Sequence, residues 1–136
     1  MGKMIIATCL VALTLTGSAI AQQQGATAPP AVTIKRTPLQ KFDVPDTKYE
    51  TIIGIAEITS NVNIGRHTHP GIESGFVLDG EMVLMVEGQP PLTLKAGDSY
   101  KIPHEAIHDA RSGDKGAKLV ATYVVEKGKP LASPAP

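Results

Sequence analysis

The stretch GRHTHPGIESGFVLDG, residues 65–80, decides how this chain is expected to fold. Two histidines stand one residue apart, and a glutamate follows four positions after the second. In an extended strand, residues i and i+2 face the same side, so His67 and His69 should project together while Thr68 faces away. The first half of the stretch therefore predicts a strand with an imidazole-bearing face.

The second half of the stretch predicts a turn and a further strand. Pro70-Gly71 should turn the chain, and Glu73 opens an apolar run in which Gly75 and Val77 share its face. A glycine beside Glu73 would leave space next to the carboxylate. Asp79-Gly80 between two apolar runs is a strong hairpin signal, so Gly80 is expected to end this strand.

The rest of the chain repeats this pattern of short apolar runs broken by Gly, Pro, Asn and Asp, and no long stretch shows helical spacing. We therefore expect an all-β sandwich or barrel. Residues 81–87 and 117–126 are apolar on both faces, which predicts that a second sheet layer or another subunit covers their outer face. The expected strands are 39–44, 49–59, 66–69, 74–79, 81–87, 91–95, 99–102, 107–111 and 117–126.

A third histidine, His108, is predicted to point inward as well. Ala110 shares its face, whereas the charged Asp109 and Arg111 share the opposite face, which suits solvent. His104 follows Pro103 in a predicted loop. It is expected either to be exposed or to contact a metal ligand without binding the metal itself. It is the only candidate for an acid–base group separate from Glu73.

Three imidazoles and a carboxylate directed into a barrel need compensation, because burying such groups unpaired is costly. A divalent transition metal would supply it, held by His67, His69, Glu73 and His108. This nitrogen and oxygen donor set suits Fe, Mn, Ni, Cu, Co or Zn, and would leave one or two positions open for water, dioxygen or substrate. The competing interpretation, exposed loop histidines, accounts for a lone His-x-His but not for the added glutamate and His108.

The spacing of these residues resembles the first motif of the cupin superfamily. That motif places His-x-His, a glutamate and a closing glycine as His67, His69, Glu73 and Gly80 stand here, with Asn61 in place of its opening glycine.

The second motif of the superfamily is present at the expected distance. Gly97, Pro103 and His108 match it, whereas Glu105 replaces a glycine and Ser112 replaces an asparagine. Neither replaced residue is a metal ligand in the family, but the shape of loop 103–107 is put in question.

The resemblance implies a double-stranded β-helix, the jelly-roll barrel of the cupins, with the metal near one mouth. It also implies a homodimer, which fits strands that are apolar on both faces. The sequence looks most similar to the quercetin-dioxygenase-like group, which includes dioxygenases, isomerases, lyases and proteins with no known reaction.

The N-terminal residues of the sequence predict export. Lys3, the apolar run Met4–Thr16 and Ala19-Ile20-Ala21 form a secretory signal peptide over residues 1–21, cleaved after Ala21. The apolar run is too short for a stable membrane anchor. The product is expected to be periplasmic or secreted.

Domain limits follow from composition: a linker over 22–37, a barrel over 38–127 and a Pro/Ala-rich tail over 128–136. Cleavage would remove Cys9, the only cysteine, and leave acidic residues in excess by one. Basic residues are scattered, so nucleic acid is not an expected partner.

These features predict a metal-dependent enzyme acting on a small, fairly apolar, oxygen-bearing molecule, with Glu73 as ligand and base and His104 as a further acid–base group. A non-catalytic metal or ligand-binding module and a metal-free barrel are the alternatives. The cavity lining is predicted to include Val77, Val83, Met85 and Ala110.

Overall fold

The computed structural model describes residues 34–136, so the predicted signal peptide and the linker up to residue 33 lie outside the described residues. Every regular element in the described part is a strand. None of these residues belongs to a helix long and apolar enough to cross a membrane.

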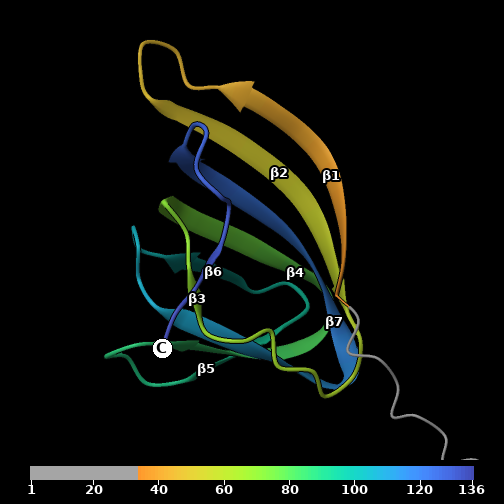
Figure 1. The fold of residues 1–136 in the computed structure, drawn as a ribbon. Coiled ribbons are helices and arrows are strands. Elements are labelled where there is room, and N and C mark those ends of the chain that lie inside the picture. The colour runs from red at the N-terminus through yellow and green to blue at the C-terminus, as the bar shows by residue number, and fades with distance from the viewer. Residues whose placement is uncertain (1–33) are drawn as a thin grey trace, which may run out of the picture.

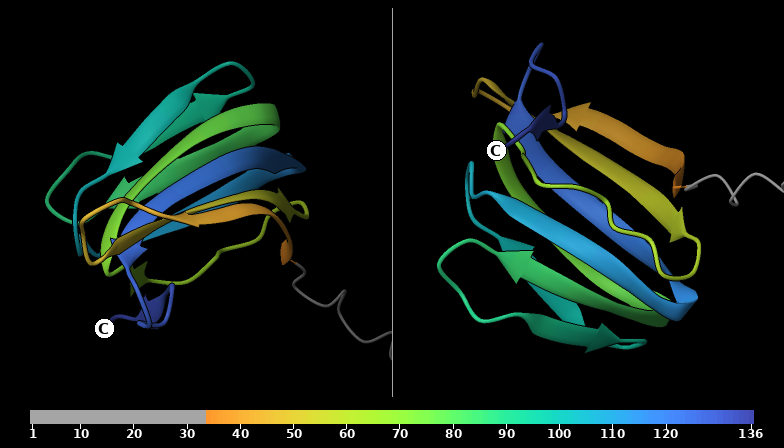
Figure 2. Two further views of the ribbon diagram at one scale, coloured as in Figure 1. Left: turned by 90° about the horizontal axis from the view of Figure 1, so that it is seen from above. Right: turned by 60° about the horizontal axis from the view of Figure 1, so that its bottom comes forward.

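The strands form one antiparallel sheet in which β1, β2, β7 and β4 are successive neighbours, and β4 also pairs with β5 and β6. The sheet curls into a half-barrel, as Figure 1 and Figure 2 show. This confirms the predicted all-β double-stranded β-helix. The strands are β1 (Ile34–Asp43), β2 (Tyr49–Ile58), β3 (His67–Thr68), β4 (Gly71–Val86), β5 (Leu92–Lys95), β6 (Ser99–Ile102), β7 (His108–Glu126) and β8 (Ser133–Pro134).

The hairpin predicted at Asp79-Gly80 is wrong, because β4 runs through it without a break. β4 and β7 pair along their whole length, and the register shifts twice near Gly80. Gly80 and Gly116 both have positive φ there, a conformation that glycine adopts without steric cost. The Asp-Gly signal therefore marks paired bulges, which bend the two long strands and curl the sheet.

The bulges also correct the predicted face of the following residues. An extra residue in β4 reverses the alternation, so Met82 and Leu84 are buried at 2% and 3% exposure. Val83 and Met85, predicted to line the cavity, face the other side. Strict alternation fails here because each bulge residue shifts the side-chain phase by one.

The outer face of the sheet carries exposed apolar side chains. Ile72, Phe76 and Leu78 on β4 are each more than two-fifths exposed. Ile72 and Phe76 pair with Val124 and Val120 of β7. Of the two segments predicted to be apolar on both faces, 117–126 thus lies beside these exposed side chains, and the homodimer implied by the resemblance stays a prediction.

The strands extend beyond the predicted barrel at both ends. β1 begins at Ile34, inside the segment predicted as linker, and β8 lies within the predicted tail. β8 pairs with β3, which brings the tail to the mouth of the barrel.

Candidate metal centre

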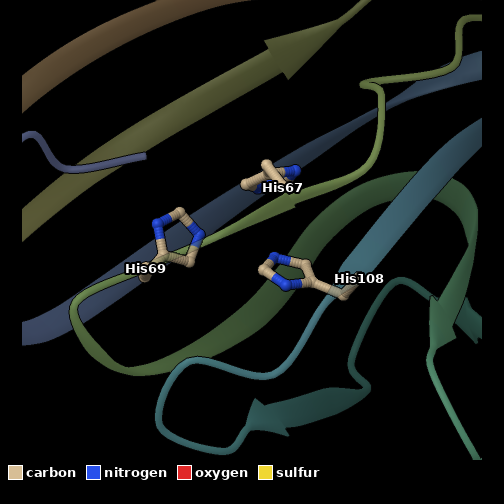
Figure 3. A group of neighbouring side chains, drawn as sticks. All are labelled: His67, His69 and His108. Atoms are coloured by element: carbon tan, nitrogen blue, oxygen red, sulfur yellow. The ribbon is translucent and has the colours of Figure 1, made fainter. Parts of the chain in front are cut away.

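Three histidines, two from the β3 segment and one from the start of β7, converge at the mouth of the barrel (Figure 3). His67 lies in β3 directly opposite His108 at the start of β7, and His69 follows β3. One ring nitrogen from each lies within 4.8 Å of the others. The predicted common face of His67 and His69 and the inward direction of His108 agree with this arrangement, and such a group could hold a metal ion.

Each imidazole is fixed through its Nδ1 atom by a backbone carbonyl. His67 Nδ1 lies 2.7 Å from the oxygen of Gly65, and His108 Nδ1 lies 2.9 Å from that of Ala106. His69 Nδ1 lies 2.6 Å from the oxygen of Leu131. A carbonyl only accepts, so each Nδ1 carries the proton. In the neutral rings, Nε2 then keeps the lone pair that a metal requires.

The Nε2 atoms of His69 and His108 are buried and make no hydrogen bond within the described residues. A carboxylate oxygen, Oε2 of Glu73, lies 2.8 Å from the first and 3.6 Å from the second. Lone pairs that face a carboxylate repel it unless a cation lies between them. The cluster therefore fits a bound metal ion, or protons that take its place.

Glu73 is 6% exposed and belongs to this polar cluster. Burial raises the pKa of Glu73, but His108, His69 and Tyr100 favour its charged form and together lower the pKa to about 2. The carboxylate is thus ionised and stands beside the imidazoles, as the sequence predicts. Its role as a fourth ligand stays a prediction.

The surroundings of His67 and His108 shift the pKa values of these two histidines in opposite directions. Burial lowers the pKa of His67, so this ring is held neutral. Burial also opposes the charged form of His108, but the nearby Glu73 outweighs it and raises the pKa of His108. The site thus favours the neutral form of His67, which offers a lone pair, and the protonated form of His108, which is a cation beside the Glu73 carboxylate.

Two tyrosines belong to the site and were missed from the sequence. The Tyr100 hydroxyl donates to Oε1 of Glu73 at 2.8 Å, and the Tyr123 ring packs edge-on against His69. Burial raises the pKa of both hydroxyls, so both are protonated at neutral pH. The available signal was the alternation in SYKI, which puts Tyr100 and Ile102 on one face.

His104, predicted as an acid–base group, does not join the cluster. Its side chain is 48% exposed and faces Glu105, with Nε2 3.7 Å from Oε2. It follows Pro103 in the loop between β6 and β7, so no strand pairing directs its side chain inward. We give it no part in the chemistry below.

A cavity of about 330 Å³ adjoins the histidines. Of the four side chains predicted to line it, only Ala110 does so. The extra residue in β4 turns Met82 and Leu84 inward in place of Val83 and Met85, whereas Val77 is fully buried in the core. The lining also contains one cation that the sequence did not suggest, Arg36 of β1. The full lining is Ile34, Arg36, Ala56, Ile58, Ile64, His67, His69, Glu73, Met82, Leu84, Tyr100, Ile102, His108, Ala110, Leu119, Tyr123, Leu131 and Ala132.

Replacing Tyr100 with phenylalanine should destabilise the protein by about 1.5–3 kcal/mol, the usual worth of a hydrogen bond to a charged group. It should also raise the pKa of Glu73, because a donor to the carboxylate is lost. Urea unfolding gives the first quantity, and NMR titration of the carboxyl carbon gives the second. Tyr49→Phe is the matched control, since the Tyr49 hydroxyl makes no hydrogen bond within residues 34–136. Equal stability losses in the two variants would contradict the assigned contact.

Comparison with known families gives one match, to the family described as the cupin domain, over residues 55–125. This span holds all three clustered histidines and Glu73. No curated protein sequence matches the chain.

Solved structures show the same fold at low sequence identity. An uncharacterized conserved protein with a double-stranded β-helix domain from Klebsiella pneumoniae has a TM-score of 0.60 and 19% identity, over 78% of this chain and 90% of its own. A cupin superfamily protein from Desulfitobacterium hafniense has a TM-score of 0.59 and 17% identity, over 74% and 84%. The DMSP lyase DddQ from Ruegeria pomeroyi has a TM-score of 0.58 and 22% identity, over 62% of this chain but only 43% of the lyase.

Proposed function

The chain belongs to the cupin family, and from that premise we propose that it is a mononuclear metal-dependent enzyme acting on a small oxygen-bearing molecule in the cell envelope. One observation carries the metal: three imidazoles converge, each with Nδ1 bonded to a backbone carbonyl. This is the arrangement by which proteins orient histidine ligands. The envelope location is supported only by the signal-like residues 1–21.

The metal, once bound, would supply Lewis acidity at an open coordination position. His67, His69 and His108 would hold it, and ionised Glu73 would neutralise part of its charge. The Tyr100 hydroxyl keeps Glu73 oriented. The apolar lining limits water around the site, which strengthens the electrostatic interactions within it.

The cavity favours a substrate with an anionic oxygen group. Arg36 lines it together with His67 and Tyr123, and makes no salt bridge within residues 34–136. Its neighbour Lys35, by contrast, pairs with Glu57 at 3.1 Å. A guanidinium left unpaired at the cavity is suited to a carboxylate, which it can bind through two parallel hydrogen bonds. The proposed substrate is therefore a small organic carboxylate.

One observation favours a non-catalytic binding module as the second candidate. Apart from the histidines and Glu73, the ionisable groups of the described lining are Arg36 and two tyrosines whose pKa values are raised. None of these is suited to exchange a proton near neutral pH. Turnover by the metal-loaded protein would exclude this candidate.

The proposal is tested with protein loaded in turn with Fe(II), Mn(II), Ni(II), Co(II), Cu(II) or Zn(II). Each form is assayed for product formation and oxygen uptake with small carboxylates and with their uncharged amides, for example lactate and lactamide. We expect turnover of carboxylates only, and an increase in KM for Arg36→Gln of roughly 10- to 100-fold, because one charge-assisted contact of about 1.5–3 kcal/mol is lost.

Lys35→Gln is the matched control for Arg36→Gln, because it removes a neighbouring charge that is already paired. It should leave KM unchanged. Equal use of lactate and lactamide would contradict the substrate class. Absence of any turnover with every metal would leave the binding module as the function.

A further inference from the structure

Residues 131–136, here called the C-terminal strap, lie across the mouth of the barrel. β8 within the strap pairs with β3, so Ser133 lies opposite Thr68 and Pro134 opposite His67. Figure 1 shows the C-terminal end of the chain beside β3. Leu131 and Ala132 line the cavity itself. The strap thus contacts the metal centre although it lies far from the two motifs in sequence.

A second set of contacts holds the strap through Arg66. The amide N–H of Ala135 donates to the Arg66 carbonyl at 3.0 Å, and Nε of Arg66 donates to the Pro136 carbonyl at 2.5 Å. The Arg66 guanidinium also pairs with Glu87. These contacts join the end of the strap to the residue directly before His67.

The strap also supplies one of the three carbonyls that orient the histidines. His67 and His108 bond to carbonyls two residues away, in their own segments. His69 alone of the three bonds to a remote segment, through Leu131, which lies 62 positions later. The Nδ1 acceptor of His69 is therefore present only when the strap is docked, whereas the acceptors of the other two rings belong to their own segments.

We propose that the C-terminal strap is a positioning element of the metal centre, in which the Leu131 carbonyl fixes His69 for metal binding and docking of the strap closes the cavity. This rests on the proposed metal function.

The strap is held weakly enough to open. Its ladder with β3 is two residues long, and Ser133 and Pro134 are both exposed. Segments with few buried contacts open at low free-energy cost. Opening removes the acceptor from Nδ1 of His69, and the loss of such an outer partner typically costs about 10- to 100-fold in metal affinity. Because linkage is reciprocal, metal binding must in turn stabilise the docked strap by the same factor.

The test compares Co(II) and Zn(II) affinity, by competition with a chromophoric chelator, in the full chain and in two kinds of variant. A chain ending at Pro130 lacks the strap and should bind both metals about 10- to 100-fold more weakly. Ala135→Pro keeps the full length but removes the N–H that donates to Arg66, and should weaken binding in the same direction by a smaller factor. Ala135→Ser retains that N–H and is the matched control, with unchanged affinity.

A spectroscopic readout separates positioning from general stability. In the metal-free full chain, two-dimensional 15N–1H NMR should show the Nδ1 proton of His69 in a hydrogen bond, and the shortened chain should lose this signature while the Nδ1 protons of His67 and His108 keep theirs. The visible spectrum of bound Co(II) should change in parallel.

Each outcome decides between the two proposals. Tight metal binding by the full chain with equal affinity in the shortened chain and in Ala135→Pro would overturn the strap proposal and leave the metal function intact. Absence of metal binding by the full chain would overturn both. If the shortened chain fails to fold, Ala135→Pro against Ala135→Ser decides the question alone.

Discussion

His69→Ala and His108→Ala should each abolish stoichiometric metal binding. The parent protein is expected to carry about one metal ion per chain, as a mononuclear site requires. Both rings are buried, at 4% and 3% exposure, and their Nε2 atoms make no hydrogen bond within residues 34–136. Losing a ligand should reduce affinity by more than the roughly 10- to 100-fold that loss of an outer partner costs. Elemental analysis of protein purified without a metal-chelating tag measures this.

The control for these variants is His104→Ala. This histidine is exposed and outside the cluster, so its removal should leave the metal content unchanged. His67→Ala should behave like the other two cluster variants. Full occupancy in His69→Ala and His108→Ala would show that the cluster does not bind the metal, and a metal-free parent would favour a purely structural barrel.

Local periodicity was enough to predict the histidine cluster. His67 and His69 lie on one face because they are two residues apart in an extended segment. The inward direction of His108 followed from the charged Asp109 and Arg111 on the other face, and its side chain is 3% exposed. The alternation around His108 survives folding because this end of β7 pairs in regular register with residues 82–86 of β4.

The wall of the cavity could not be predicted in the same way. The extra residue of β4 between Val77 and Asp79 shifts the phase of everything that follows it in β4, so Met82 replaces Val83 on the inner face. An Asp-Gly pair signals a break in regular pairing, but it does not say whether the chain reverses or only bends. That choice depends on β7, which bends at Gly116 in the same place.

Contacts between distant segments were equally inaccessible from sequence. Nothing local to Leu131 indicates that its carbonyl would reach His69, and nothing local to Tyr100 indicates Glu73. Both contacts depend on which strands become neighbours. Arg36 was missed for a related reason, since the expected linker included it, whereas β1 begins at Ile34.

Gly75→Ala should be among the most damaging single substitutions in the barrel. Gly75 lies opposite Tyr100 in the pairing of β4 with β6. A methyl group at Gly75 would lie far inside van der Waals contact with the Tyr100 ring and hydroxyl. The space that the sequence predicted beside Glu73 is therefore filled by this tyrosine. Overpacking of this kind costs about 1–3 kcal/mol, and displacing the Tyr100 hydroxyl from Glu73 adds about 1.5–3 kcal/mol.

A double-mutant cycle identifies the cause of this loss. In a Tyr100→Ala background the ring is absent, so adding Gly75→Ala should lower the free energy of unfolding only slightly. The effects of the two substitutions on this free energy, measured by urea unfolding, should therefore be strongly non-additive. The same substitution should weaken metal binding, because Glu73 loses the donor that orients it. If Gly75→Ala costs as much without the Tyr100 ring as with it, the glycine is required by the backbone of β4, and not to make room for the tyrosine that holds the carboxylate.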